Sequence, residues 1–305
     1  MRILVTGADG FLGRGLVNAL AARNNRADKI TLTDLGRSET CPDFMDFKPG
    51  DLGDPSFLDE LTQSGFDLVF HLASIPGSRA EQDQALGHRV NLMAPLSLAD
   101  RLAAGNAGTR FVFASSIAVY GDLASRTVNP DTPCHPQLTY GAHKLMTEIM
   151  LSDMTRRGAL STISIRFPGI VARPQSESGH GSAFMSQLFH RIRANEPFEC
   201  PVPAESTCWW MSRDAAVGTL LHAAGLAATE GCIIQPPALR ATVAEVVEAA
   251  MRVAGRRPLV SYGRNDALQR IFGSMPHLDA SQAFSRGFRA DANVDTLAQA
   301  AFSGV

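Results

Sequence analysis

A tyrosine and a lysine that stand four residues apart are the first groups in this sequence that could do chemistry. Tyr140 and Lys144 lie in the segment YGAHK, and side chains at this spacing share one face of a helix. An ammonium group beside a phenol stabilises the phenolate and lowers the pKa of the phenol from about 10 towards neutrality. The tyrosine then becomes a workable general base that can take a proton from an alcohol.

A hydroxyl-bearing residue, Ser116, precedes Tyr140 by 24 positions and follows a predicted strand. In open α/β sheets ligands bind beyond the carboxyl ends of the strands, so this hydroxyl would face a bound substrate. The Tyr-x-x-x-Lys spacing by itself is more typical of an amphipathic helix with an exposed lysine. The prediction that Ser116, Tyr140 and Lys144 are catalytic therefore depends on the elements around them.

Three glycines in TGADGFLG are the second feature with chemical meaning, because Gly7, Gly10 and Gly13 lie between a predicted strand and a predicted helix. The amides of such a turn approach a pyrophosphate closely, and the helix N-terminus adds positive potential. Asp34 closes the next strand, 21 residues after Gly13, where a carboxylate would bind the adenosine ribose. Its charge repels a 2′-phosphate and favours NAD over NADP, although Arg37 could accommodate that phosphate. A plain turn with a surface aspartate is the alternative.

A parallel sheet would bring these groups together, and the alternation of short apolar runs with helical patterns predicts one. The predicted strands cover residues 3–6, 29–33, 66–72, 109–115 and 160–167. The predicted helices cover residues 10–23, 89–104 and 139–157. Continuous apolar strands are typical of parallel sheets that are buried on both faces. We therefore predict an α/β fold with a Rossmann-type doubly wound parallel sheet.

Prolines and glycines cluster between residues 168 and 203, which indicates loops and shorter elements outside the sheet. A helix over 214–228 and a strand over 231–235 are expected to return to the sheet. A further helix over 242–254 would end with Gly255 as its C-cap. We predict an NAD-binding Rossmann domain at 1–167 and 213–236 and a smaller, discontinuous substrate-binding domain at 168–212 and 237–305.

Charge and cysteine content narrow the expected partners. The 28 Lys and Arg residues nearly balance the 30 Asp and Glu residues, so the formal net charge is −2. This balance predicts neither a nucleic-acid partner nor a polybasic membrane contact, and no apolar run approaches the ~20 residues that span a bilayer. The five cysteines form no CxxC pair and the eight histidines show no metal-ligand spacing, which predicts no metal site. The absence of a disulfide framework favours the cytoplasm.

Taken together, the motifs resemble those of the extended short-chain dehydrogenase/reductase family, the NAD-dependent epimerases and dehydratases. The similar segments are TGADGFLG, Asp34, the Asp51–Leu52 pair, HLAS at 71–74, Asn91, SSIAVYG at 115–121 and YGAHK at 140–144. The resemblance implies NAD as the cofactor. It also implies a homodimer that forms through the helix of Tyr140 and its neighbour around residues 89–104.

The resemblance further assigns the cofactor contacts residue by residue. The pyrophosphate would be held by Gly7, Gly10, Phe11, Leu12 and Gly13, and the adenosine ribose by Asp34. The adenine would lie between Asp51 and Leu52, and the neighbouring ribose and phosphates would contact Leu72, Ala73 and Ser74. The nicotinamide ribose would bond to Tyr140 and Lys144, and the carboxamide would lie beside Pro168. Asn91 is interpreted as structural.

Two departures from the wider family bear on the reaction. Ser116 is followed by Ile117 and Ala118, where the dehydratases carry an acidic pair, and this difference argues against dehydration. Arg166 is followed by the residues FPG, where nucleotide-sugar epimerases carry an asparagine near the substrate phosphates. A nucleotide-sugar substrate therefore loses support.

The segments at 71–91, 166–174 and 200–212 resemble those of sugar-acid oxidoreductases in the family. They imply NAD-dependent oxidation of a secondary hydroxyl of a short sugar acid, most specifically the 2-hydroxyl of D-erythronate, to the 2-oxo acid. The alternatives are a nucleotide-sugar epimerase with tightly bound NAD and a noncatalytic NAD-binding sensor.

A sugar acid also needs a carboxylate site, which suits the planar fork of arginine. Arg173 is the first candidate because it begins the predicted substrate domain, and a plain surface arginine is the alternative. The full set of predicted substrate contacts is Ser74, Ser78, Ser116, Tyr140, Arg173 and Ser182.

Overall fold

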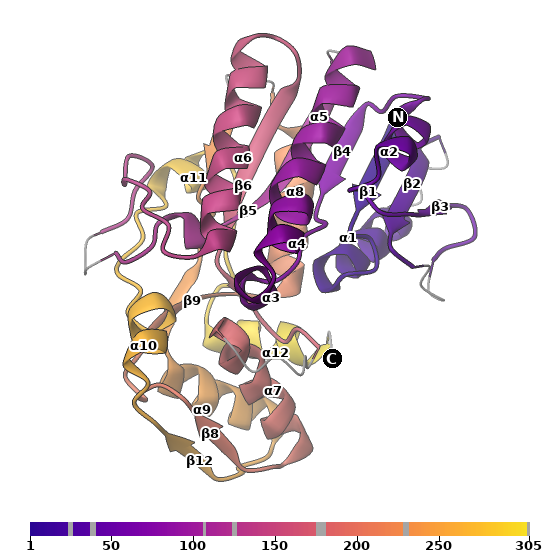
Figure 1. Ribbon diagram of the computed structural model, residues 1–305. Helices are drawn as coiled ribbons and strands as arrows, with labels where there is room; N and C mark the ends of the chain where they lie inside the picture. The colour runs from indigo at the N-terminus through magenta and orange to yellow at the C-terminus, as the bar shows by residue number, and fades with distance from the viewer. Residues whose placement is uncertain are drawn as a thin grey trace. The chain divides into compact units, whose positions relative to one another are not determined.

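The structure, a computed structural model, describes residues 1–23, 27–36, 41–105, 108–123, 127–174, 181–227 and 232–303. Its chain divides into two units (Figure 1). The first unit comprises Met1–Val119, Pro136–Arg166 and Leu220–Ile234. The second comprises Tyr120–His135, Phe167–Thr219 and Gln235–Val305. Arg37, which could accommodate the 2′-phosphate of NADP, lies outside the described residues.

The unit boundaries differ from the predicted domains in one internal segment. Residues 120–135, which the sequence pattern placed with the Rossmann domain, belong to the second unit. A backbone bridge explains this placement, because Val128 N donates to His277 O at 2.9 Å and Asp279 N donates to Val128 O at 2.8 Å. The return to the first unit also begins later than predicted, at Leu220 rather than at residue 213.

A seven-stranded sheet in the order β10-β6-β5-β4-β1-β2-β3 forms the centre of the first unit. The strands are β1 (Arg2–Thr6), β2 (Lys29–Asp34), β3 (Asp46–Pro49), β4 (Leu68–His71), β5 (Arg110–Ser116), β6 (Ser161–Phe167) and β10 (Cys232–Ile234). β1 pairs in parallel with both β2 and β4, and β2–β3, β4–β5 and β6–β10 are parallel as well. The chain reverses its direction of travel across the sheet beside β1, as in a doubly wound fold.

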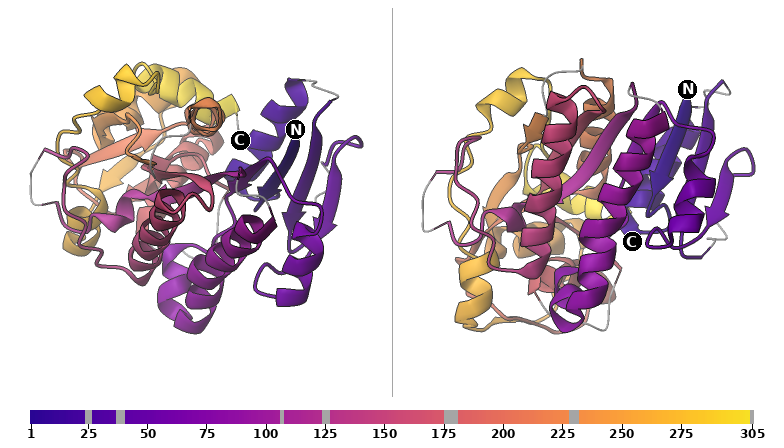
Figure 2. Two further views of the ribbon diagram at one scale, coloured as in Figure 1. Left: turned by 90° about the horizontal axis from the view of Figure 1, so that it is seen from above. Right: turned by 45° about the horizontal axis from the view of Figure 1, so that its top comes forward.

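Helices cover both faces of this sheet. In Figure 2, α2 (Pro55–Thr62), α5 (Ala94–Gly105) and α6 (Thr139–Arg156) lie on one face, and α1 (Phe11–Ala22) lies on the other with the end of α8 (Arg213–Gly225). Buried apolar side chains of the sheet and of α2, α5 and α6 form one core cluster, which includes Leu4, Leu58, Leu98, Phe111 and Leu151. All four residues of β4 are buried, which agrees with the apolar run Leu68–Phe70.

Short elements connect β4 to α5 and β5 to α6. They are α3 (Gly77–Gln82), α4 (Gln84–His88), the π-helical turn η1 (Arg89–Met93) and the 3₁₀ turn η2 (Ile117–Val119). Because the strands are parallel, the turns after β1, β2, β4 and β5 all leave the sheet at its carboxyl edge. This edge carries the glycine loop, Asp34, the HLAS segment and Ser116.

Among its described residues, the second unit contains two small sheets. β9 (Thr207–Met211) pairs antiparallel with β11 (Leu239–Thr242) and parallel with β7 (Gly169–Ile170), and β8 (Phe198–Cys200) pairs with β12 (Val260–Tyr262). Its helices are η3 (Gly181–Ala183), α7 (Phe184–Ala194), α9 (Val243–Ala254), α10 (Asp266–Phe272), α11 (Ser281–Ser285) and α12 (Val294–Ser303). α9 begins with a capping box between Thr242 and Glu245 and ends at Gly255, whose φ is 64°, which confirms the predicted helix and C-cap.

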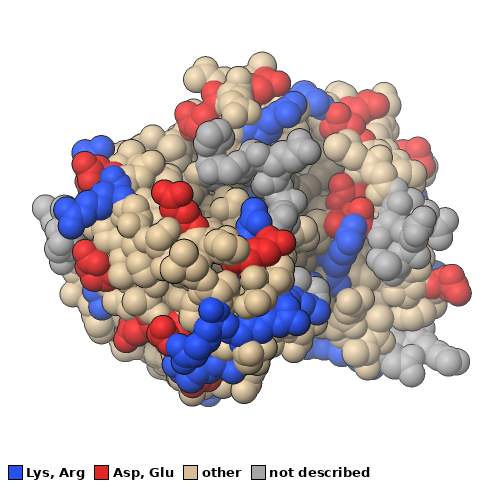
Figure 3. All heavy atoms as spheres, turned by 90° about the horizontal axis from the view of Figure 1, so that it is seen from below, with Lys and Arg blue, Asp and Glu red and all other residues tan. Residues whose placement is uncertain are grey.

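Charges at the ends of α7 and α9 are locally balanced. Arg191 and Arg252 lie in the last helical turns, where the helix dipole favours cations, and they pair with Glu196 and Asp295. Figure 3 shows a stripe of basic side chains on one face of the molecule, bordered by acidic side chains.

Within the described part of the chain, no helix is both long and apolar enough to cross a bilayer, and no cluster of three His, Cys, Asp or Glu residues could hold a metal ion.

Candidate active site

The loop between β1 and α1 carries the three glycines of TGADGFLG and packs closely against the segment after β4. Gly7 has a φ of 67°, a left-handed conformation that favours glycine. A Cβ atom at Gly7 would lie 2.6 Å from the backbone nitrogen of Ala73, and one at Gly13 would lie 2.0 Å from the carbonyl oxygen of Gly7. Gly10 N donates to Gly7 O at 3.1 Å and closes the turn. The loop therefore presents backbone rather than side chains.

The N-terminus of α1 follows this loop directly. Gly10 is the N-cap residue, and it supplies no side-chain cap. The first turn, which contains the predicted contacts Phe11, Leu12 and Gly13, carries no acidic side chain. The partial positive charge of the helix end is thus not neutralised by a carboxylate of its own turn. A bare backbone loop and an open helix N-terminus fit the pyrophosphate of a dinucleotide.

Asp34 ends β2, and its carboxylate is fixed beside the glycine loop. Its Oδ2 accepts a hydrogen bond from Asp9 N at 3.0 Å, and its Oδ1 accepts one from Leu35 N at 2.8 Å. These two amides orient the half-buried carboxylate at the carboxyl edge of the sheet. An adenosine ribose would be expected at this position.

Asp51, a predicted adenine neighbour together with Leu52, pairs with an arginine that the sequence pattern did not single out. Its Oδ2 lies 2.5 Å from Arg89 Nη1, and its Oδ1 accepts a hydrogen bond from Gly53 N at 2.7 Å. Partial burial raises the pKa of Asp51, but the hydrogen bonds from Arg89 and Gly53 outweigh it and hold the pKa below its usual value. Both Asp51 and Arg89 are partly exposed, so their ion pair is accessible to solvent.

The segment after β4 is held by Asn91. The Asn91 side chain is 1% exposed, and its Oδ1 accepts hydrogen bonds from Ser74 Oγ and Ile75 N, both at 2.9 Å. Its Nδ2 donates to Ile75 O at 3.1 Å. The predicted contacts Leu72 and Ala73 donate their backbone amides to Thr6 Oγ1 at 3.3 and 3.4 Å. Asn91 lies in the π-helical turn η1, a distortion that is frequent at functional sites.

Ser116 ends β5, and α6 begins against the turn that follows it. Ser116 Oγ accepts a hydrogen bond from Ala118 N at 3.1 Å. A Cβ atom at Gly141 would lie 2.3 Å from the carbonyl oxygen of Ala118. Only glycine permits this approach, so the second residue of YGAHK lets the first turn of α6, and Tyr140 with it, lie beside the end of β5.

Lys144 is buried, with 2% of its surface exposed. Its Nζ donates a hydrogen bond to Ala114 O at 2.8 Å and lies 4.7 Å from the centroid of the Phe113 ring and 5.4 Å from that of the Tyr140 ring. Burial lowers the pKa of Lys144 to about 7, and the carboxylate of Glu148 acts in the opposite direction. A desolvated lysine thus stands beside Tyr140.

An ion pair that the sequence reasoning missed lies one turn further along α6. Glu148 is fully buried and pairs with Arg166 of β6, whose Nη2 lies 2.8 Å from Glu148 Oε2. Ser115 Oγ donates to Glu148 Oε1 at 2.5 Å. The spacing could have indicated this group, because Glu148 follows Lys144 by four residues and shares its helix face.

α3 packs beside Tyr140 on the first unit. A Cβ atom at Gly77 would lie 3.5 Å from Tyr140 Cβ, and the predicted substrate contact Ser78 follows Gly77 in the same turn. Glu81, also on α3, accepts a hydrogen bond from Thr139 N at 2.5 Å. Ser78 therefore belongs to the same group of elements as Tyr140, with a half-buried side chain.

The remaining predicted residues, Pro168, Arg173 and Ser182, belong to the second unit. Arg173 Nη2 donates to Ser182 Oγ at 3.1 Å, so the structure brings two of the predicted substrate contacts together. Arg173 N donates to Ser186 Oγ at 3.2 Å. The preceding residue, Ala172, is buried and has a φ of 57°, a rare conformation outside glycine that is often found at functional sites.

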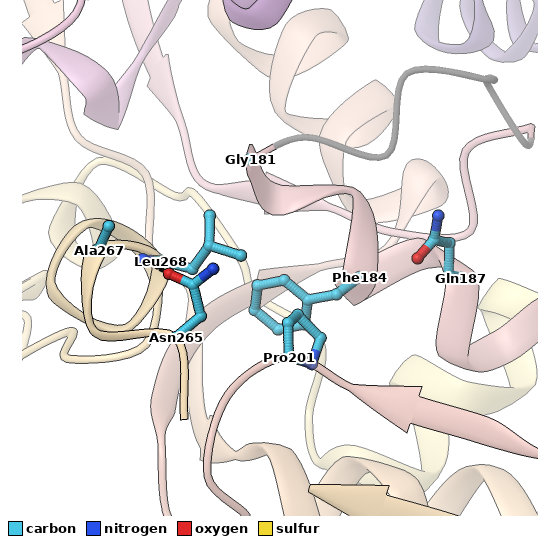
Figure 4. Close-up of a pocket in the computed structure, with 7 residues that line it drawn as sticks. All are labelled: Gly181, Phe184, Gln187, Pro201, Asn265, Ala267 and Leu268. Atoms are coloured by element: carbon cyan, nitrogen blue, oxygen red, sulfur yellow. Dashed lines mark hydrogen bonds between the residues drawn. The ribbon is translucent and has the colours of Figure 1, made fainter. Parts of the chain in front are cut away.

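The second unit contains a hollow of about 300 Å³. One of its lining residues, Gly181, directly precedes Ser182 in the sequence. It is lined by Gly181, Phe184, Gln187, Pro201, Asn265, Ala267 and Leu268. Figure 4 shows the Phe184 ring beside Pro201, with Asn265 and Gln187 on opposite sides of it. The Asn265 side chain caps α10 by accepting a hydrogen bond from Leu268 N at 3.1 Å. The wall thus combines apolar surface with two carboxamides.

Comparisons with known proteins agree with this geometry. A model of the NAD dependent epimerase/dehydratase family matches residues 3–225. A D-erythronate dehydrogenase of Haemophilus influenzae is 31% identical over 98% of this chain and 98% of its own length. One of Cupriavidus necator is 33% identical over 98% of this chain and 97% of its own. A solved structure titled nucleoside-diphosphate-sugar epimerase, from Agrobacterium tumefaciens, has a TM-score of 0.91 at 30% identity and covers 99% of this chain and 94% of that chain. Together with the sheet order, these matches confirm the predicted fold class.

Proposed function

Because this chain belongs to the NAD-dependent epimerase/dehydratase family and uses NAD as its cofactor, we propose that it oxidises a secondary hydroxyl of a short sugar acid, with the 2-hydroxyl of D-erythronate as the first candidate. The observation that carries the proposal is the buried lysine, whose Nζ lies 5.4 Å from the Tyr140 ring centroid. The names of the two full-length relatives support the class of substrate.

The cofactor would be held by the groups at the carboxyl edge of the sheet. The glycine loop and the first turn of α1 fit its pyrophosphate, and Asp34 fits its adenosine ribose. The charge of Asp34 favours a ribose with a free 2′-hydroxyl. When bound, NAD supplies the hydride acceptor, and the protein supplies position and electrostatics.

Three side chains of the first unit would then handle the substrate hydroxyl. Tyr140 takes the hydroxyl proton on its phenolate oxygen while the C–H bond releases a hydride and a carbonyl forms. The ammonium of Lys144 stabilises the phenolate, and its burial strengthens that interaction. Ser116 donates a hydrogen bond to the substrate oxygen and orients it.

Arg173 is proposed to bind the substrate carboxylate, assisted by Ser182. The guanidinium and the Ser182 hydroxyl are already in hydrogen-bond contact at 3.1 Å. A carboxylate can accept from both groups, and a guanidinium offers two parallel donors. Because the net charge of the chain is only −2, local donors of this kind must capture an anionic substrate.

We also propose that the protein forms a homodimer through α6 and its neighbour α5. Three exposed apolar side chains on α6 share one face at helical spacing: Met146 is 41% exposed, Ile149 58% and Met150 44%. Met93, in the turn that leads into α5, is 46% exposed. An apolar stripe of this kind is suited to burial against a second copy.

The test of the activity is NADH formation by purified protein with NAD and D-erythronate, followed by absorbance, beside a panel of other aldonates. We expect NADH with D-erythronate and a 2-oxo acid as the product. No NADH from any aldonate would contradict the proposal. One alternative to test is an epimerase, because one of the similar solved structures carries that name. An epimerase would retain its NAD through dialysis and would convert a nucleotide sugar without net formation of NADH.

A noncatalytic sensor is the other alternative. A Tyr140→Phe variant removes the proposed base without altering the shape of the site. If this variant binds NAD normally but forms no NADH, the protein is an enzyme that uses Tyr140. If it retains the full biological effect, the sensor is favoured.

A further inference from the structure

A buried network of charged and polar side chains joins three elements of the first unit directly behind the proposed catalytic residues. Glu148 on α6 is 0% exposed and Arg166 on β6 is 7% exposed by side chain. Arg166 Nε lies 3.1 and 3.2 Å from the two carboxylate oxygens of Glu148, and Nη2 lies 2.8 Å from Oε2. Ser115 of β5 donates its hydroxyl to the other side of the carboxylate.

Stability alone gives a weak reason for such a pair. Removing two charges from water is costly, and apolar residues of similar volume often replace a buried ion pair without loss of stability. The pair therefore calls for a role that apolar residues would not perform.

The neighbours of the network indicate that role. Ser115 stands between Ala114, whose carbonyl oxygen accepts the Lys144 Nζ hydrogen bond, and Ser116. Glu148 follows Lys144 by one helical turn. One carboxylate thus lies beside the residues that fix both the serine and the lysine of the site.

Resting on the proposed function, we propose that Glu148 is a positioning residue for the oxidation: it holds the Ser115–Ser116 end of β5 against α6 and extends to higher pH the range in which Lys144 stays charged beside Tyr140. Arg166 moderates this effect, because it neutralises part of the Glu148 charge and holds the carboxylate away from a direct ion pair with Lys144.

The charges around Lys144 determine whether its pKa rises or falls when Glu148 loses its charge. Burial lowers the pKa of Lys144 to about 7, and Glu148 opposes that decrease. Burial lowers the pKa of His71 on β4 to about 3, so this imidazole is neutral near pH 7. Among the described residues, Tyr140 and His143 on α6 also lie near Lys144, Arg166 on β6 pairs with Glu148, and His88 on α4 and Glu81 on α3 act on His143. Loss of the Glu148 charge should therefore lower the pKa of Lys144 further.

The experiment compares the native protein with Glu148→Gln/Arg166→Met, which removes both charges but keeps an acceptor for Ser115. Glu148→Leu/Arg166→Met is a second charge-free variant, in case the buried amide prevents folding. The first measurement is the free energy of unfolding in urea as a function of pH, without cofactor or substrate. In the native protein it should begin to rise near pH 7, where folded Lys144 loses its proton. In the charge-free variants this onset should move down by roughly one pH unit.

The second measurement is the pH dependence of kcat and KM for NADH formation. A neutral Lys144 gives the Tyr140 phenolate less support, so the rising limb of kcat should move to higher pH in the charge-free variants, with KM changing less than kcat. Ser115→Ala is the matched control, because it removes the hydrogen bond but keeps the charge of Glu148. It should lower kcat. It should change neither the pH at which the free energy of unfolding begins to rise nor the pH of the rising limb of kcat.

The outcomes separate the two proposals. If the charge-free variants lose stability equally at every pH, or if the kinetic limb does not move, Glu148 is only structural and the inference is overturned. If the native protein oxidises no aldonate, the proposed function fails. The unfolding curves still decide whether Glu148 keeps Lys144 charged, because they require neither substrate nor cofactor.

Discussion

Replacing Lys144 by methionine should stabilise the folded protein, with an effect that depends on pH. Methionine keeps most of the length of the lysine chain but removes the buried amine. Burial lowers the pKa of Lys144 from 10.5 to about 7. Since one pKa unit corresponds to about 1.4 kcal/mol, the buried ammonium destabilises the fold by on the order of 5 kcal/mol when fully protonated. Loss of the hydrogen bond to Ala114 O would subtract about 1 kcal/mol from the gain at every pH.

The direction with pH follows from proton counting. Below pH 7, Lys144 is protonated in both the folded and the unfolded protein, and the penalty is complete. Between pH 7 and 10.5 the unfolded chain holds one proton more, so the free energy of unfolding of the native protein rises by about 1.4 kcal/mol per pH unit. The advantage of Lys144→Met should therefore be about 4 kcal/mol near pH 6 and shrink to about 1 kcal/mol near pH 9.

Urea unfolding followed by circular dichroism at a series of pH values measures this difference. Lys29→Met, at an exposed position of β2, is the matched control and should show no pH-dependent gain. If the native and Lys144→Met curves run parallel across the range, Lys144 keeps its ordinary affinity for protons and the argument for a desolvated lysine is wrong.

Four further predictions concern the site and the subunit contact. Tyr140→Phe should lower kcat by roughly 10²–10⁴-fold and leave NAD affinity, measured by calorimetry, nearly unchanged; unchanged kcat would exclude Tyr140 as the base. Asp34→Asn keeps an acceptor for the loop amides but removes the charge, so the ratio of the Kd for NADP to that for NAD should fall, whereas an unchanged ratio would remove Asp34 from cofactor selection. Arg173→Gln should raise KM for the sugar acid by roughly tenfold or more with little change in kcat, and equal KM values would mean that another group binds the carboxylate. Ile149→Glu should convert a dimer into a monomer in light scattering, while Leu259→Glu, at a position 75% exposed in the second unit, should not; two equal molar masses would place the contact elsewhere.

Much of the first unit was predictable because its strands are apolar runs and its turns carry glycine or aspartate. The structure confirms the predicted helices around α1, α5 and α6 and the parallel strands β1, β2, β4, β5 and β6. β3 was missed, since only four residues form it at the sheet edge and its ends, Asp46 and Pro49, are exposed. An edge strand of this kind lacks the apolar run that marks a central strand.

The location of residues 120–135 was not predictable either, for a different reason. This segment joins the second unit through the backbone bridge between Val128 and Leu278. Pairing over 150 positions leaves no periodic signal in either segment. The pattern of alternating elements predicts neighbours along the chain, and it carries no information on a loop that pairs with a distant one.

Within the candidate site, spacing could indicate the residues proposed to contact ligand, but not the residues that hold those side chains in place. Tyr140, Lys144 and the glycine loop follow local rules of helix face and turn. Arg89 beside Asp51 depends on long-range contact, and no spacing rule predicts it. The four-residue spacing that relates Tyr140 to Lys144 also relates Lys144 to Glu148. Glu148 was missed because its partners, Arg166 and Ser115, come from separate strands.

The burial that makes Lys144 unfavourable for folding is also what would make it useful for proton transfer. An exposed ammonium would be screened by water and would stabilise a phenolate only weakly. A buried ammonium acts at low dielectric but tends to lose its proton, so the site needs a second charge that raises the pKa of the lysine without binding it directly. Glu148, held by Arg166 and Ser115, meets both requirements. An apolar core at this place would be easier to fold, but it would leave Tyr140 without a charged neighbour near neutral pH.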